Sequence, residues 1–220
     1  MKVIITGASG MIGKGVLLEC LDDPEIEEVL TIGRSLIDIV HEKLVQIKHE
    51  DFSSYDNISN QLNHCDACYM CMGISAAGLS EEKYSEITYD YTMALAQKLY
   101  ELNPDMTITY VSGQGTDSSE KGRSMWARVK GKTENDLLKI GFNQAFMFRP
   151  GGIIPLRGIK SKTKSYQMFY SYFMWLIKLI KLIAPNSIVN TTQIAKAMIK
   201  VTKSGYHKNI IDPKDIIELS

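Results

Sequence analysis

The first residues of this chain combine an apolar run, a glycine-rich turn and the start of a helical pattern. Residues 2–6 read KVIIT, a β-branched run typical of a buried strand, and GASGMIG follows at once over residues 7–13. Apolar residues then recur at helical spacing over residues 16–21. A strand, a sharp turn and a helix in this order predict a phosphate-binding element in an α/β fold.

The glycines have the spacing G-x-x-G-x-x-G, and each has a physical role in such a turn. Gly7 permits the sharp turn, Gly10 lets the backbone approach a pyrophosphate, and Gly13 lets the helix pack closely on the strand. The free N–H groups and the positive dipole end of the helix would face the phosphates. The phosphate-contacting candidates are therefore Gly7, Ser9, Gly10, Met11, Ile12 and Gly13.

The length and charge of the chain restrict its class. At 220 residues it fits one domain, or one domain with a small cap. The 25 Lys and Arg residues balance 25 Asp and Glu residues, which gives no reason to expect a nucleic-acid partner. Met1 leads directly into the first apolar run with no recognisable signal peptide, so we expect a cytoplasmic protein.

Strand-like runs alternate with helical patterns along the whole chain. Strands are predicted at residues 2–6, 28–32, 44–48, 67–72, 107–111, 145–148 and 209–211, and helices at 11–21, 81–102, 125–140, 166–183 and 191–203. This alternation predicts a doubly wound parallel sheet of the Rossmann type, with helices on both faces and ligands at the C-terminal strand ends. Because Gly151, Gly152 and Pro155 mark a change of organisation, we divide the chain into a nucleotide-binding domain, 1–155, and a small C-terminal cap or substrate region, 156–220.

The residues after the second strand bear on the choice of dinucleotide. At this place an acidic side chain accepts a hydrogen bond from a ribose 2′-hydroxyl, whereas an arginine binds a 2′-phosphate. Arg34 and Ser35 stand here, so the sequence favours NADP(H) over NAD(H). The alternative is that Arg34 is an ordinary surface residue.

Three other strand ends supply further cofactor candidates. An acid and an aromatic residue after the third strand could bind an adenine, although a simple turn explains them equally well. A glycine after the fourth strand could lie beneath the adenosine ribose, and glycine-rich backbone after the sixth could lie against a nicotinamide. These candidates are Asp51, Phe52, Met72, Gly73, Pro150, Gly151 and Ile153.

The fifth strand and the helix after it carry the candidates for catalysis. The strand leads into Ser112, and Trp126 and Lys130 lie four residues apart on one face of the predicted helix. With TGASGMIG, GRS, DF, CMG, VSGQG, WARVKGKTE and FRPGG in order, the chain resembles the short-chain dehydrogenase/reductase superfamily from residue 2 to about residue 155. It is most similar to the extended and atypical branches, which include the NAD-dependent epimerase/dehydratase, Tat-interacting oxidoreductase-like and NmrA-like proteins.

The resemblance implies a catalytic Tyr-x-x-x-Lys, but Trp126 stands where the tyrosine is expected. By this resemblance Lys130 would bind the nicotinamide ribose and Ser112 would orient a substrate carbonyl. An indole N–H donates a hydrogen bond but does not transfer a proton near neutral pH. Replacement donors could be Ser112 itself, a bound water, Gln114, Tyr84 or Tyr166.

Two functions are consistent with this pattern. One is an NADP-dependent oxidoreductase or epimerase-like enzyme with altered acid–base machinery, acting on an unknown small molecule with a carbonyl or hydroxyl group. The other is a catalytically inactive protein that senses NADP(H) and regulates a protein partner.

Two remaining features have a structural explanation. Cys65, Cys68 and Cys71 form C-x-x-C-x-x-C, but steps of three along a strand point to opposite faces, so we expect no metal site. Residues 166–183 form an apolar stretch with a polar stripe at helical spacing, which predicts an amphipathic helix rather than a transmembrane span. We expect this helix to form a cap, a homodimer contact or the docking site of a protein partner, with a membrane-surface helix as the alternative.

Overall fold

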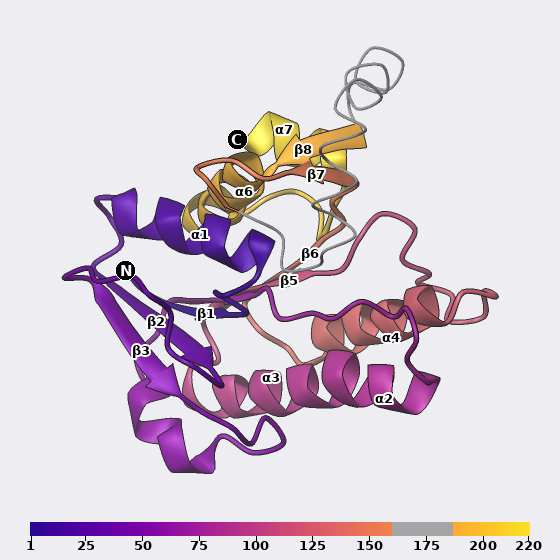
Figure 1. Cartoon of the computed structure of the whole chain (residues 1–220), viewed down its shortest axis with the longest axis horizontal. Helices are drawn as coiled ribbons and strands as arrows, with labels where there is room; N and C mark the ends of the chain where they lie inside the picture. The colour runs from indigo at the N-terminus through magenta and orange to yellow at the C-terminus, as the bar shows by residue number, and fades with distance from the viewer. Residues whose placement is uncertain (160–186) are drawn as a thin grey trace.

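The computed structural model describes residues 1–159 and 187–220, which form an α/β sandwich around a seven-stranded parallel sheet (Figure 1). The strand order is β3-β2-β1-β4-β5-β6-β9. The strands are β1 Lys2–Thr6, β2 Glu28–Gly33, β3 Leu44–Lys48, β4 Ala67–Met70, β5 Thr107–Val111, β6 Gln144–Phe148 and β9 Ile210–Ile211. The order reverses between β1 and β4, and such a switch point opens a ligand crevice at the C-terminal strand ends.

Helices cover both faces of the sheet, as the sequence predicted (Figure 1). One face packs against α1 Met11–Asp22, α6 Thr191–Ser204 and α7 Pro213–Leu219. The other packs against the 3-10 helix η1 Asp56–Leu62 and a helical run made of α2 Glu81–Ser85, the π-helical turn η2 Glu86–Asp90 and α3 Tyr91–Leu102, followed by α4 Met125–Lys139. The fold expected from the alternation is confirmed.

Two short strands form a second parallel pair outside the main sheet, β7 Gly152–Ile154 and β8 Ile188–Asn190. Neither was predicted, and neither were η1 and α7, because three-residue strands and seven-residue helices carry too little periodicity to detect. The predicted helix over 166–183 lies outside the described residues. The division of the chain near residue 155 stays a prediction, although β9, α6 and α7 all pack with the main sheet.

The fourth strand is shorter than predicted. It ends at Met70 rather than at residue 72, because the Cys71 N–H turns back to the carbonyl of Tyr69 at 3.1 Å. Cys68 is completely buried in the sheet. Within residues 1–159 and 187–220, no three His, Cys, Asp or Glu side chains are grouped as metal ligands. In the same residues, no helix has the length and apolarity that a membrane crossing needs.

Candidate functional site

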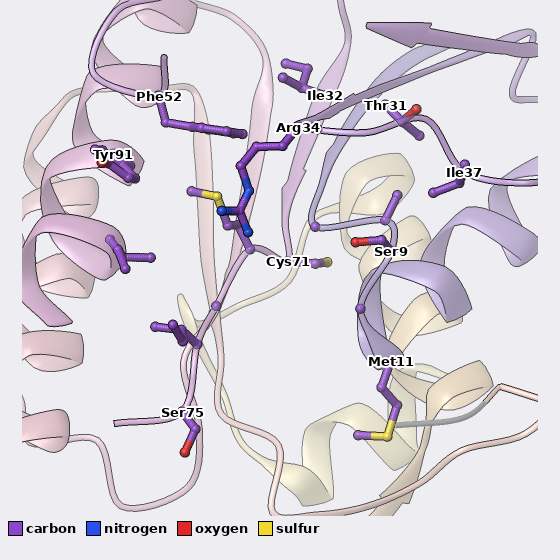
Figure 2. Close-up of a pocket in the computed structure, with 18 of the residues that line it drawn as sticks. Ser9, Met11, Thr31, Ile32, Arg34, Ile37, Phe52, Cys71, Ser75 and Tyr91 are labelled. Carbon is purple, nitrogen blue, oxygen red and sulfur yellow. The ribbon is translucent and has the colours of Figure 1, made fainter. Parts of the chain in front are cut away.

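A cleft of about 1140 Å³ opens at the C-terminal ends of β1, β2 and β4, where the strand order reverses (Figure 2). Its walls come from the β1–α1 turn, from the segments after β2, β3 and β4, from one side of the helical run over residues 83–91, and from the β7–β8 pair. The predicted residues that line it are Gly7, Ser9, Gly10, Met11, Arg34, Ser35, Phe52, Met72, Gly73, Gly151 and Ile153. The cleft is therefore bounded by most of the predicted cofactor residues.

The glycine turn has the geometry of a phosphate cradle. Gly7 has a φ of +70°, and a Cβ there would lie 2.5 Å from the carbonyl oxygen of Cys71. A Cβ on Gly13 would lie 2.2 Å from the carbonyl oxygen of Gly7, so the first turn of α1 packs directly on the end of β1. Gly10 caps α1 without a side-chain acceptor, so the first N–H groups of this helix have no capping side chain. A phosphate group fits these donors and the backbone that the glycines leave bare.

Two predicted members of this turn do not line the cleft. Gly13 faces the backbone of Gly7, and Ile12 packs against the hydrophobic core beneath α1. Their contribution here is the close contact between helix and strand, which fixes the position of the helix N-terminus.

Arg34 extends from the end of β2 into the pocket, towards the end of β4 (Figure 2). Arg128, Arg149 and Arg157 each form ion pairs, but no carboxylate among the described residues pairs with Arg34. Its exposed guanidinium therefore presents an uncompensated positive charge to the cleft, next to Ser35. This geometry suits an anionic group on a ligand.

An aromatic wall stands beside Arg34. Phe52 is buried, and its ring centroid lies 5.9 Å from that of Tyr91 on α3. Figure 2 shows both rings on the same side of the pocket. Glu50 and Phe52 line the cleft rather than Asp51, whose Oδ1 accepts hydrogen bonds from the Ser53 hydroxyl at 2.5 Å and the Ser53 N–H at 2.9 Å. These bonds lower the pKa of Asp51 and indicate a local turn.

Three lining residues on the helical run were missed by the sequence analysis. Lys83, Ile87 and Tyr91 line the cleft at steps of four residues. A regular helix rotates such positions gradually around its axis, but the π-helical turn η2 keeps them on one side. The spacing of the three residues was visible in the sequence, whereas the π-helical turn was not.

At the other end of the cleft, the loops after β5 and β6 lie against each other. The Gln114 N–H donates to the Pro150 carbonyl at 2.9 Å. Gln114, Gly151 and Ser187 line this end, whereas Pro150 contributes through its carbonyl and does not line the cleft.

Ser112 does not line the cleft, and its hydroxyl takes part in a buried network. The hydroxyl donates to Glu134 Oε1 at 2.5 Å and lies 3.1 Å from the Phe148 carbonyl oxygen. Glu134 is completely buried on α4 and forms a two-point ion pair with Arg149. An ionised carboxylate only accepts hydrogen bonds, so the single proton of Ser112 is directed away from the cleft.

Lys130 lies close to Ser112 and Trp126 packs on the loop that follows it, but neither residue lines the cleft. The Lys130 ammonium donates to the carbonyl oxygens of Val111 at 3.1 Å and Ser112 at 2.8 Å. Burial lowers the pKa of Lys130 to about 8. Trp126 packs on the loop after β5, because a Cβ on Gly115 would lie 3.5 Å from the indole ring. The structure therefore brings the three predicted catalytic residues together without exposing them to the cleft.

The residues proposed as replacement proton donors differ in whether they reach the cleft. Tyr84 is 2% exposed and does not line the cleft, so its hydroxyl does not reach a ligand there, and burial raises its pKa. Gln114 lines the cleft but carries an amide, which does not titrate. Tyr166 lies outside the described residues.

The sequence model of the NAD dependent epimerase/dehydratase family matches residues 3–119, from β1 to the loop after β5. The chain belongs to this family. The resemblance expected from the motifs is thereby confirmed.

Two named relatives each match most of this chain. The chain is 26% identical over 158 residues to protein FMP52, mitochondrial, of Candida albicans, a match that covers 70% of this chain and 68% of that one. It is 26% identical over 155 residues to protein HTATIP2 of Rattus norvegicus, covering 70% of this chain and 63% of that one. The second match thus spans less than two thirds of the relative's length.

Two solved enzyme structures share the fold of this chain. The Bordetella bronchiseptica enzyme WbmF in complex with NAD+ superposes with a TM-score of 0.70 at 11% identity, covering 99% of this chain and 76% of that one. The UDP-N-acetylglucosamine 4-epimerase of Methanobrevibacter ruminantium superposes with a TM-score of 0.67 at 18% identity, covering 96% and 75%. At these identities the likeness establishes the Rossmann fold alone.

The expected cytoplasmic location is wrong in the light of these relatives. The FMP52 proteins of Candida albicans and Saccharomyces cerevisiae are both designated mitochondrial. Our expectation rested on the lack of a secretory signal at the N-terminus, and that lack does not separate the cytoplasm from an organelle.

Proposed function

We propose that this chain binds NADP(H), with the pyrophosphate at the β1–α1 turn and the adenosine between Arg34 and the aromatic wall of Phe52 and Tyr91. The observation that carries this proposal is the glycine turn, where the missing Cβ atoms leave backbone and helix N–H groups bare. Arg34 supports NADP(H) over NAD(H), because its guanidinium has no ion-pair partner within residues 1–159 and 187–220 and suits a 2′-phosphate, to which Ser35 adds a hydroxyl.

Calorimetric titration of the full-length chain with NADPH and then with NADH tests this assignment. We expect NADPH to bind at least tenfold more tightly, because a charge-assisted hydrogen bond contributes about 1.5–3 kcal/mol. Equal affinities would contradict the role of Arg34. Binding of neither dinucleotide would contradict the whole proposal.

The reaction class that family membership favours is oxidoreductase or epimerase-like chemistry on a carbonyl or hydroxyl substrate. A bound nicotinamide would supply the hydride or accept it. Lys130 supports this proposal through its position, because its ammonium is held on the Val111 and Ser112 carbonyls where the loop after β5 begins. Oxidation of NADPH across a panel of aldehydes and ketones, lost in Lys130→Met, is the expected result. A wild-type rate no higher than the blank would contradict it.

A regulatory role as an NADP(H)-sensing binding protein is the second candidate, and the Ser112 network favours it. The hydroxyl that would orient a substrate carbonyl is committed to Glu134. Trp126, at the place of the expected tyrosine, has no titratable proton. This function predicts NADPH binding without turnover, and a partner whose capture from a lysate differs between apo and NADPH-loaded protein.

A further inference from the structure

The order of the strands determines which residues lie at the two ends of the cleft. Arg34 follows β2, the glycine turn follows β1, and Gln114 follows β5, in a sheet ordered β2-β1-β4-β5. Arg34 and Gln114 therefore lie on opposite sides of the glycine turn. Three strand spacings of about 4.8 Å place their strand ends ~14 Å apart. A dinucleotide with its pyrophosphate at the turn and its adenosine at Arg34 would extend its other half towards Gln114.

The conformation of Gln114 is held by the loop after β6. Its N–H donates to the Pro150 carbonyl at 2.9 Å, and its side-chain Oε1 lies 2.6 Å from the place where a Cβ on Gly151 would stand. The Ser187 carbonyl oxygen lies 2.3 Å from the same point. Any side chain at residue 151 would displace the Gln114 amide, so Gly151 leaves room for it at the cleft surface.

The Gln114 amide is available to a ligand. The side chain is exposed, and none of the described residues forms a hydrogen bond with its amide. The Ser112 hydroxyl, on the same loop, instead directs its single proton to the Glu134 carboxylate, with the Phe148 carbonyl as a second nearby acceptor. The polar side chain that this loop presents to the cleft is therefore Gln114.

We propose that Gln114 recognises the carboxamide of the nicotinamide ring. A primary amide offers donors and an acceptor side by side, and another primary amide is its complement. The nicotinamide is the part of NADP(H) that carries such a group, and the strand order directs it to this end of the cleft. The proposal rests on NADP(H) binding, and it adds a residue that reads the reactive end of the cofactor.

The test compares two ligands that differ only in the nicotinamide, NADPH and 2′-phospho-ADP-ribose. Gln114→Met keeps the length of the side chain but loses its hydrogen bonds. By calorimetry, this variant should bind NADPH about tenfold more weakly, the loss expected from one or two neutral hydrogen bonds, and should bind 2′-phospho-ADP-ribose within twofold of wild type. Gln97→Met, at an exposed position on α3 away from the cleft, is the matched control and should leave both affinities unchanged.

A second probe examines the same contact from the ligand side. The 3-acetylpyridine analogue of NADPH keeps the carbonyl but replaces the amide NH₂ with a methyl group. Wild type should bind this analogue several-fold more weakly than NADPH, and Gln114→Met should bind the two alike.

Three results would overturn the proposal. They are unchanged NADPH affinity in Gln114→Met, an equal loss for NADPH and 2′-phospho-ADP-ribose, and an unaltered preference for NADPH over its analogue in the variant. If wild type bound neither NADPH nor 2′-phospho-ADP-ribose, NADP(H) binding itself would be refuted. This outcome differs from failure of the Gln114 contact alone, in which wild type still binds both ligands.

Discussion

The two ends of the cleft differ in whether their charged side chains have ion-pair partners in the fold. At one end, which we call the Arg34 end, the arginine side chain extends into the cleft without an ion pair among the described residues. At the β5 end, Ser112, Glu134 and Arg149 satisfy one another in the interior. A charge left unpaired at a cleft suits a ligand, whereas a charge paired in the interior holds elements of the fold together.

This contrast assigns different tasks to residues that look alike in the sequence. The Ser112 hydroxyl, the Glu134 carboxylate and the Arg149 guanidinium join β5, α4 and β6 into one unit. The Arg34 end is formed by loops that follow β2 and β3, at one edge of the sheet. Substitutions at the two ends should therefore separate stability from ligand affinity.

The largest effect is expected from Glu134→Ala, which leaves Arg149 without its buried partner. Removing one member of a buried ion pair costs about 3–5 kcal/mol of unfolding free energy. Glu81→Ala, which breaks the ion pair of Arg128 with the half-exposed Glu81, should cost less than about 1 kcal/mol. Urea unfolding of both variants measures the difference. A loss below 1 kcal/mol for Glu134→Ala would contradict the structural role of the network.

The next largest loss of unfolding free energy is expected from Gly7→Ala. The substitution places a Cβ 2.5 Å from the Cys71 carbonyl oxygen on a residue with positive φ. Together the strained backbone and the overlap should lower the unfolding free energy by about 2–4 kcal/mol. Gly73→Ala is the matched control, because a Cβ on Gly73 would meet nothing within 4 Å. Equal losses for the two variants, in thermal or urea unfolding, would show that the turn is not tightly packed.

Arg34→Ser should act on affinity and not on stability. The exposed side chain forms no ion pair within the described residues, so the unfolding free energy should change by less than about 0.5 kcal/mol. NADPH affinity should fall about 10–100-fold, whereas NADH affinity should stay within twofold. Calorimetry checks both values, with Arg123→Ser as an exposed arginine outside the cleft. A parallel loss for NADPH and NADH would place Arg34 on a part common to the two dinucleotides.

Lys130 makes the stability of the β5 end depend on pH. Burial lowers its pKa to about 8 in the folded chain, from about 10.5 in an unfolded one, so the unfolded chain binds more protons between these values. The unfolding free energy of wild type, relative to Lys130→Met, should therefore rise with pH through this window. We expect a rise of about 1–2 kcal/mol, allowing for partial exposure. Lys200→Met, at an exposed position on α6, should show no such trend, and a flat difference for Lys130→Met would refute the shift.

The sequence predicted the residues that line the cleft better at the Arg34 end than at the β5 end, and there is a physical reason. The glycine turn was predicted from the backbone geometry that glycines permit, and Arg34 was predicted from its charge at the end of a strand. Both properties depend only on residues that are close in the sequence. The hydrogen bond of the Ser112 hydroxyl depends on Glu134, which is 22 residues away in the sequence, and Glu134 is in turn paired with Arg149 after the next strand. Lys83, Ile87 and Tyr91 reach the cleft because of a π-helical turn that leaves no clear mark in the residue pattern. Local roles can be read from sequence, whereas side-chain partners brought together by tertiary contacts cannot.

The smallest effect is expected from Trp126→Tyr, the change that restores Tyr-x-x-x-Lys. The new ring would still face Gly115, which does not line the cleft, and Ser112 would still donate its proton to Glu134. NADPH affinity should stay within about twofold, and NADPH oxidation with a panel of carbonyl compounds should not rise above the wild-type rate. Matched titrations and absorbance at 340 nm check both. A clear gain in turnover would mean that Ser112 and the wall rearrange when a substrate binds, and that the contrast between the two ends belongs to the ligand-free protein alone.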